Sequence, residues 1–259
     1  MAQPAPSIAL PCEPLRPFVE RYAVVRSTSD VPFNVLPGTG LVLGFQFSGA
    51  VKRVGPGGPR KLHRSGVTGL HGAAATFQSE AGTGTVLVYF REAGATAFFP
   101  EPLNELFGRS LSLEQFMLRS ELVLLEERLE EAANDANRVA VVEAFLLERL
   151  RPAKPDALVV GALALIHRSK GSIRIEQLAE QLHTSRSPLE RRFRKAVGAT
   201  AKQYAGIVRM RQVLSAHVPG TALLDTALEA GFYDQAHFIK AFRTFTGEAP
   251  QRFFGPTED

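Results

Sequence analysis

Four basic side chains within five residues could bind a polyanion: Arg191, Arg192, Arg194 and Lys195. Arg191 and Arg194 are three residues apart, so they share one face of a helix. The arginine guanidinium is a planar fork that matches O6 and N7 of guanine, and arginine or lysine can also hold a phosphate. The group therefore predicts a helix that contacts DNA. The alternative is a solvated basic face on an ordinary helical bundle.

The residues around this group predict where its helix begins and which side it buries. Ser187, Pro188 and Glu190 match a capping box, with proline at the first helical position and glutamate at the third. Leu189 and Phe193 are four residues apart and are expected to face the core.

A second segment, Tyr233–Arg243, repeats this pattern. Asp234 is the expected cap, and Phe238 and Phe242 are expected to point inward. The side chains left outside are Gln235, His237, Lys240 and Arg243.

Each of these helices has a partner that would complete a helix-turn-helix unit. The first partner carries the stripe of Ile175, Leu178, Ala179 and Leu182, and the second, which is shorter, carries Leu223, Ala227 and Ala230. Asp156 is the expected cap of a preceding helix, and Lys170-Gly171 its end. A longer helix, Tyr204–Ser215, would join the two units. Two reading helices on one body would reach major-groove segments about one turn (~34 Å) apart.

The charge distribution supports this placement. From Ala157 to Asp259 the chain carries 14 Lys and Arg against 9 Asp and Glu, whereas the preceding residues carry 16 against 17. A basic C-terminal part is typical of a nucleic-acid-binding region.

The first hundred residues predict a small β-barrel or sandwich. Leu41–Phe47 and Thr85–Arg91 are apolar strand candidates, and Gly55–Pro59 between them is a turn signal. Leu15–Tyr22 fits either a short helix or an edge strand. A barrel of this size can enclose one molecule. Arg91 and Phe98-Phe99 are possible contacts for a ligand, although a solvated strand end and core packing are the commoner roles.

Two further helices are expected before residue 150. The first places Leu118, Leu122, Leu125 and Leu129 on one side and Glu121, Glu126, Glu127, Glu130 and Glu131 on the other. The second runs from about Asn137 to Arg149, with Val141, Phe145 and Leu146 as its apolar residues. They either cover the sheet, which is the commoner use, or form a surface for a partner chain. The prolines in Leu150–Asp156 end the helical pattern.

The C-terminal motifs resemble the DNA-binding domain of the AraC/XylS family over about Asp156 to Phe254. The resemblance rests on Leu178-Ala179, Ser185–Phe193, Gly198, Tyr204, Arg209, Gly231–Phe238, Phe242-Arg243, Gly247 and Pro250. Residues Leu15 to Phe116 are similar to the small-barrel sensor domain of one subgroup of this family. The matching residues are Leu15–Phe18, Tyr22, Val35–Gly38, Val88–Arg91, Gly94 and Pro102-Leu103.

The resemblance implies two sets of base-reading residues. The first set is Ser187, Glu190, Arg191 and Arg194, and the second is Gln235, His237 and Lys240. Arg209 and Arg243 are implied to be framework or phosphate-contacting positions. Two features depart from the family pattern: Thr226 replaces an apolar residue, and the expected capping role of Glu190 competes with base contact.

Catalytic and metal-binding motifs are weak in comparison. His63 and His71 are the histidines of the barrel region and lie eight residues apart, so no clustered metal site is predicted. No nucleophile elbow or phosphate-binding loop is recognised. The single cysteine, Cys12, is expected to be inert.

The sequence thus predicts an α+β protein and a non-enzymatic, sequence-specific DNA-binding transcription regulator without a cofactor. Residues 1–150 are expected to form a β-barrel or cupin-like sensor domain with covering helices, 151–156 a linker, and 157–259 a double helix-turn-helix domain. The helices near 187–196 and 235–244 would read DNA through Ser187, Glu190, Arg191, Arg194, Lys195, Gln235, His237, Lys240 and Arg243.

Double-stranded DNA is the expected partner, and RNA polymerase, a small-molecule effector and a second copy of the chain are further candidates. No apolar run long enough to span a membrane and no secretory signal is recognised, which predicts a cytoplasmic protein. The alternatives are a helical protein-interaction module or a barrel enzyme, either of them without a role on DNA.

Overall fold

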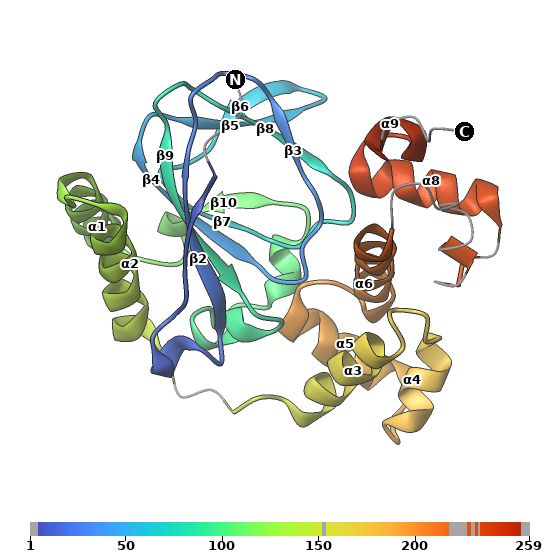
Figure 1. Cartoon of the computed structure of the whole chain (residues 1–259). Coiled ribbons are helices and arrows are strands. Elements are labelled where there is room, and N and C mark those ends of the chain that lie inside the picture. The colour runs from blue at the N-terminus through green and yellow to red at the C-terminus, as the bar shows by residue number, and fades with distance from the viewer. Residues whose placement is uncertain (1–4, 152–153, 218–226, 229–230, 233, 255–259) are drawn as a thin grey trace.

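The computed structural model describes residues 5–151, 154–217, 227–228, 231–232 and 234–254. Its N-terminal part consists of two facing antiparallel sheets, and its C-terminal part is helical (Figure 1). The expected α+β class is confirmed. No helix in the described part of the chain is both long enough and apolar enough to cross a bilayer.

The larger sheet has six strands, in the order β1-β2-β9-β4-β7-β10, and the smaller has four, in the order β3-β8-β5-β6. The bounds of the first set are Ser7–Ala9, Val19–Arg26, Gly84–Phe90, Val42–Ser48, Ser65–Thr68 and Ser110–Ser112. Those of the second are Phe33–Val35, Ala75–Ser79, Val51–Gly55 and Gly58–Lys61.

Short 3-10 helices connect and flank these strands: η1 (Glu13–Leu15), η2 (Gly94–Ala97), η3 (Leu103–Leu106) and η4 (Leu113–Gln115). The segment Leu15–Tyr22 contains both of the structures that the sequence left open, since η1 ends at Leu15 and β2 begins at Val19. β2 is not an edge strand, because it pairs with both β1 and β9.

Helices α1 (Arg119–Glu131) and α2 (Asp135–Arg149) cover the outer face of the larger sheet (Figure 1). Phe45 on β4 and Phe145 on α2 meet edge to face, with ring centroids 5.9 Å apart. Of the two roles that the sequence left open for these helices, covering the sheet is therefore the one observed.

Two residues that were expected in this first helix, Leu118 and Glu126, differ from the predicted pattern. Leu118 precedes the helix as its N-cap and is exposed, so it does not belong to the apolar side. Glu126, expected on the polar side, is buried, because it accepts a hydrogen bond from Ser65 Oγ at 2.7 Å and lies 3.5 Å from Arg119. The hydroxyl of Ser65, distant in sequence, and Arg119, on the same helix, compensate the buried carboxylate.

The remaining helices are α3 (Ala157–Arg168), α4 (Ile175–Gln181), α5 (Arg186–Val197), α6 (Ala201–Ala216), α8 (Gln235–Thr246) and α9 (Pro250–Phe254). Asp156 caps α3 as expected, since its carboxylate accepts from the amides of Leu158 and Val159. Gly171 follows in the left-handed conformation, with a φ of 77°. Figure 1 shows α6 between α3–α5 on one side and α8–α9 on the other.

A polar network joins the barrel to the first helix-turn-helix unit. Glu92, just after β9, accepts from Tyr204 Oη at 3.1 Å and lies 3.3 Å from His167 Nε2. The bond to His167 is the main cause that lowers the pKa of Glu92 to about 2. This carboxylate is therefore ionised and ties the barrel to both α3 and α6.

Candidate DNA interface

Helix α5, the first candidate reading helix, begins earlier than the sequence predicts. Its N-cap is Ser185, whose side chain makes no capping bond, and Arg186 is its first residue. The predicted capping box of Ser187 and Glu190 is therefore wrong. Pro188 is tolerated at the third helical position because amides of the first turn have no intrahelical partner.

The two sides of α5 are sharply different in burial. Leu189 and Phe193 are fully buried, as predicted, and Val197 continues their stripe. The exposed side chains of the opposite face are Ser187, Arg191, Arg194 and Lys195. Glu190 lies at the edge of this face; it is half-buried, and its Oε2 is buried without a hydrogen-bond partner. It is thus less accessible to DNA than the other four.

Arg192 faces a different neighbour from the rest of the basic group. Its guanidinium pairs with the carboxylate of Asp156 through two hydrogen bonds, one of them 2.7 Å long. This bond lowers the pKa of Asp156. Arg192 therefore fastens α5 to the start of α3, a role that local sequence spacing does not reveal.

Helix α8, the second candidate reading helix, has the expected cap and core. Asp234 Oδ1 accepts from the amide of His237 at 2.7 Å, which confirms the predicted cap. Phe238 and Phe242 are buried, with ring centroids 5.5 Å apart. The four side chains predicted to be outside are all exposed: Gln235, His237, Lys240 and Arg243.

The helix predicted before α8 falls mainly outside the described residues. Leu223, Thr226, Ala230 and Tyr233 belong to that part of the sequence. Of the described neighbours, Ala227 and Phe232 are buried, and the Phe232 ring packs edge to face on Phe238 at 5.2 Å.

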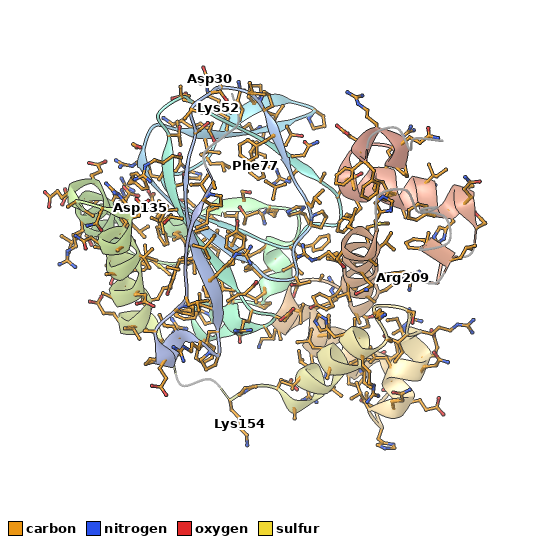
Figure 2. All side chains as sticks on the ribbon, in the orientation of Figure 1. Asp30, Lys52, Phe77, Asp135, Lys154 and Arg209 are labelled. Carbon is orange, nitrogen blue, oxygen red and sulfur yellow. The ribbon has the colours of Figure 1, made fainter. Side chains whose placement is uncertain are left out.

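Arg209 on α6 connects the two units (Figure 2). Its Nε and Nη2 donate to Gly171 O at 3.0 and 2.7 Å, and its Nη1 donates to Gly231 O at 3.5 Å. One guanidinium thus contacts the turn after α3 and the turn before α8. This geometry fits a framework position, one of the two roles that the resemblance implies for Arg209.

Apart from the half-buried Glu190, the predicted site residues therefore form two exposed patches on separate helices. The α5 patch is strongly basic, whereas the α8 patch combines an amide, an imidazole and two cationic side chains. Such groups can donate to phosphates and to base edges in a major groove. Among the described residues, no group of three or more His, Cys, Asp or Glu side chains is placed to hold a metal ion.

Comparisons with known proteins find matches to two parts of the chain. A family model described as a helix-turn-helix domain matches residues 178–255, and a domain of unknown function (DUF6597) matches residues 7–112. The Msm operon regulatory protein of Streptococcus mutans is 29% identical over 154 residues, which are 58% of this chain and 55% of that protein. The ornithine utilization regulator of Pseudomonas aeruginosa is 38% identical over 81 residues, 30% of this chain and 23% of that protein.

The chain thus spans about half, or less, of the length of these curated relatives. A solved structure of ToxT from Vibrio cholerae aligns with a TM-score of 0.49 and 12% identity, over 90% of this chain and 97% of that chain.

Proposed function

Because the chain belongs to the AraC/XylS family of transcription regulators, we propose that it binds double-stranded DNA sequence-specifically and thereby regulates transcription. The observation that carries the proposal is the exposure of both predicted reading faces. Each helix buries an apolar stripe in its own unit and leaves basic or amide groups in solvent. A protein-interaction module without a role on DNA gives no reason for basic groups on both helices.

In this proposal the two patches contact different segments of the DNA. Arg191 and Arg194 on α5 read bases through their guanidinium forks, with Ser187 and Glu190 as further contacts and Lys195 on phosphate. On α8, Gln235, His237 and Lys240 read the second segment and Arg243 holds a phosphate. Phosphate contacts supply most of the affinity, and the base contacts supply the choice of sequence.

The finer expectations about domains and partners remain part of this proposal. Residues 1–150 act as a sensor or assembly domain, 151–156 connect, and 157–259 read DNA in the cytoplasm. RNA polymerase and a second copy of the chain are the proposed macromolecular partners besides DNA. A small-molecule effector is also proposed. Phe98 and Phe99, considered above as ligand contacts, are both buried in the core.

Selection from a random pool of double-stranded DNA tests the proposal. We expect a two-part motif whose parts are about one helical turn apart, because two reading helices lie on one chain. Affinity for the selected site should fall steeply with salt, since each phosphate contact releases counterions. No enrichment, or an affinity that is independent of salt, would contradict the proposal.

A further inference from the structure

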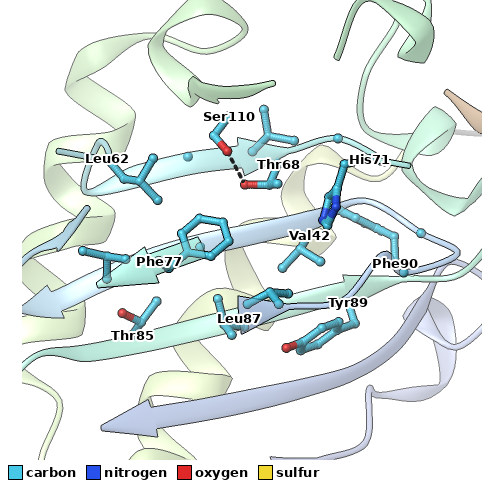
Figure 3. A pocket seen from close by; sticks show the side chains of 18 of the residues that line it. Val42, Leu62, Thr68, His71, Phe77, Thr85, Leu87, Tyr89, Phe90 and Ser110 are labelled. Carbon is cyan, nitrogen blue, oxygen red and sulfur yellow. Dashed lines mark hydrogen bonds between the residues drawn. The ribbon is translucent and has the colours of Figure 1, made fainter. Parts of the chain in front are cut away.

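A small cavity of about 230 Å³ lies within the segment Phe99–Phe116, which supplies all of its lining residues. This segment contains η3, β10 and η4. The cavity is distinct from the larger one of about 470 Å³ between the two sheets (Figure 3), although Leu111 lines both. A dry cavity of about 150 Å³ can hold benzene, so the smaller cavity has room for one ring with a short chain.

The walls of the smaller cavity are partly aromatic and partly aliphatic. Phe99 and Phe116 meet edge to face, with ring centroids 5.4 Å apart. Leu103, Leu106 and Leu111 add to this apolar lining. Such walls favour an organic molecule over a hydrated ion.

Glu101 is a lining residue with incomplete hydrogen bonding. Its side chain is half-buried, and its Oε2 is buried without a hydrogen-bond partner among the described residues. A buried carboxylate oxygen that lacks a donor costs free energy, which a bound donor would recover. An ammonium group would do so through charge-assisted hydrogen bonds.

The charged groups of the lining favour a cation. Besides Glu101 they are Glu105 and Arg109, which are both exposed, and Arg109 Nη1 donates to the backbone oxygen of Glu105 at 3.3 Å. Two carboxylates therefore face one guanidinium. A hard metal ion would need several oxygen ligands, and no group of three or more His, Cys, Asp or Glu side chains in the described ranges is placed to hold one. An organic cation fits both the charge and the walls.

Helix η3 joins this cavity to the first reading helix. Leu103 and Leu106 of η3 line the cavity, and a Cβ added at Gly198, where α5 ends, would lie 3.2 Å from Leu103 O. The chain after β7 also packs closely on η3, because a Cβ added at Gly69 would overlap Leu106 O. The wall of the cavity is thus also the surface against which α5 ends.

We propose that this cavity binds a one-ring amine or a similar organic cation whose ammonium group pairs with Glu101, and that the bound cation restrains η3 and the last turn of α5. The site is separate from the DNA interface and from the cavity between the sheets. Binding and restraint are properties of the protein alone, so both can be measured without DNA. Only a consequence for DNA binding depends on the proposed function.

Isothermal titration calorimetry of the full chain measures binding of 2-phenylethylamine, a one-ring amine that is cationic at neutral pH. The comparison ligands are 2-phenylethanol, which has the same shape without the charge, and 3-phenylpropanoate, which is an anion. We expect the amine to bind at one site, at least tenfold more tightly than the alcohol, and the anion to bind more weakly than either, because only the amine brings a charged donor to Glu101. No binding of the amine, or equal binding of amine and alcohol, would overturn the proposal.

A matched pair of glutamate variants tests the ion pair. Glu101→Gln keeps the shape of the side chain and removes its charge, so it should weaken amine binding at least tenfold and abolish the preference over the alcohol. Glu114→Gln should change the affinity less than twofold, since Glu114 is exposed, pairs with Arg119 at 2.9 Å and does not line the cavity. Equal effects of the two variants would overturn the role of Glu101.

A second pair of variants tests where the amine binds. Gln115→Trp enlarges an exposed residue that lines the smaller cavity and should weaken binding at least fivefold. Gly44→Leu narrows the larger cavity and should change binding less than twofold, and Thr85→Phe serves the same purpose if Gly44→Leu does not fold. The reverse pattern would place the amine between the sheets and would overturn the assignment.

Hydrogen exchange of the full chain tests the restraint. Saturation with the amine should slow exchange at least threefold in the backbone amides of residues 103–109 and 195–198, and change it less than 1.5-fold in α8. Unchanged exchange in residues 103–109 would contradict binding in this cavity, and an equal change in α8 would overturn the specific effect on α5. Failure of the DNA selection would count against the proposed function and leave these results intact.

Discussion

The two helix-turn-helix units are built on the same pattern but rest on the barrel in different ways. The first is held to the barrel by side chains, since Glu92, just after β9, contacts both α3 and α6. The second contacts the barrel through its backbone, since the amide of Ala74 donates to Thr244 O of α8 at 3.4 Å. Two copies of one motif can thus be held by different kinds of contact, one by side-chain bonds and the other by a backbone bond.

The reading faces differ as well. The α5 face offers three cationic side chains close together, whereas Gln235 and His237 give α8 two groups without a permanent charge. The first helix is therefore expected to supply more of the salt-dependent affinity, and the second more of the sequence discrimination.

The largest expected effects come from the aromatic cores of the two units. Phe193→Ala and Phe242→Ala each remove a fully buried ring and should cost about 3–5 kcal/mol of unfolding free energy. Hydrogen exchange should show α3 and α5 opening in the first variant, and α8 and α9 in the second. If both variants open all four helices equally, the units are one cooperative body and the contrast between them fails.

Removing Arg209 should weaken the contact between the two helix-turn-helix units and lower the stability of the protein. Arg209→Met deletes two bonds to Gly171 O and one to Gly231 O, and bonds from a charged donor contribute about 1.5–3 kcal/mol. Thermal unfolding should report the loss, and selection should accept a wider range of spacings between the two parts of the DNA motif. Arg252→Met, at an exposed position on α9, is the control. An unchanged spacing preference would mean that other contacts fix the two units relative to each other.

Neighbouring arginines on α5 provide a matched pair for base reading. Arg191→Ala should cost about 1–3 kcal/mol on the selected site, concentrated at one base pair, because a bidentate contact to guanine is lost. Arg192→Ala should instead lower stability and leave base preference unchanged, since its guanidinium is held by Asp156. Quantitative binding to single-base variants of the site distinguishes the two. Equal loss on every sequence would make Arg191 a phosphate contact.

The caps and buried stripes could be predicted from sequence because they depend on neighbours within one or two turns. Asp156, Asp234, Phe193 and Phe242 all lie where local spacing places them. The predicted start of α5 is wrong because Ser185 and Ser187 are both acceptable N-caps. Proline fits at any position of the first turn, so Pro188 does not distinguish them.

The burial of Glu126 and the cavity between the two sheets could not be predicted, because each depends on a distant segment. Glu126 is buried only because β7 brings Ser65 to it. The alternation of β4 reveals two faces, but only the pairing of the sheets shows which face encloses space. The contribution of Arg211 to a cavity in the barrel has no local signal at all.

The smallest expected effect concerns the link of the barrel to the first unit. Glu92→Gln should cost about 1 kcal/mol near neutral pH, because the amide loses the charge-assisted bonds to His167 and Tyr204. The folded-state pKa of Glu92, about 2, lies below its ordinary value, so its stabilisation is complete above about pH 5 and is lost as pH falls toward 2. The difference in unfolding free energy between the two proteins should shrink over that range. A difference that is constant with pH would contradict the ionised network.

The central claim is that α5 and α8 each recognise one part of the DNA motif. Its most direct test repeats the DNA selection with Arg191→Ala and with Gln235→Ala. Because the two residues lie on different reading helices, we expect each variant to lose sequence preference in one part of the motif and to keep it in the other. The two affected parts should be about one helical turn apart. Loss at the same base pairs in both variants, or a uniform loss of affinity in both, would contradict the account.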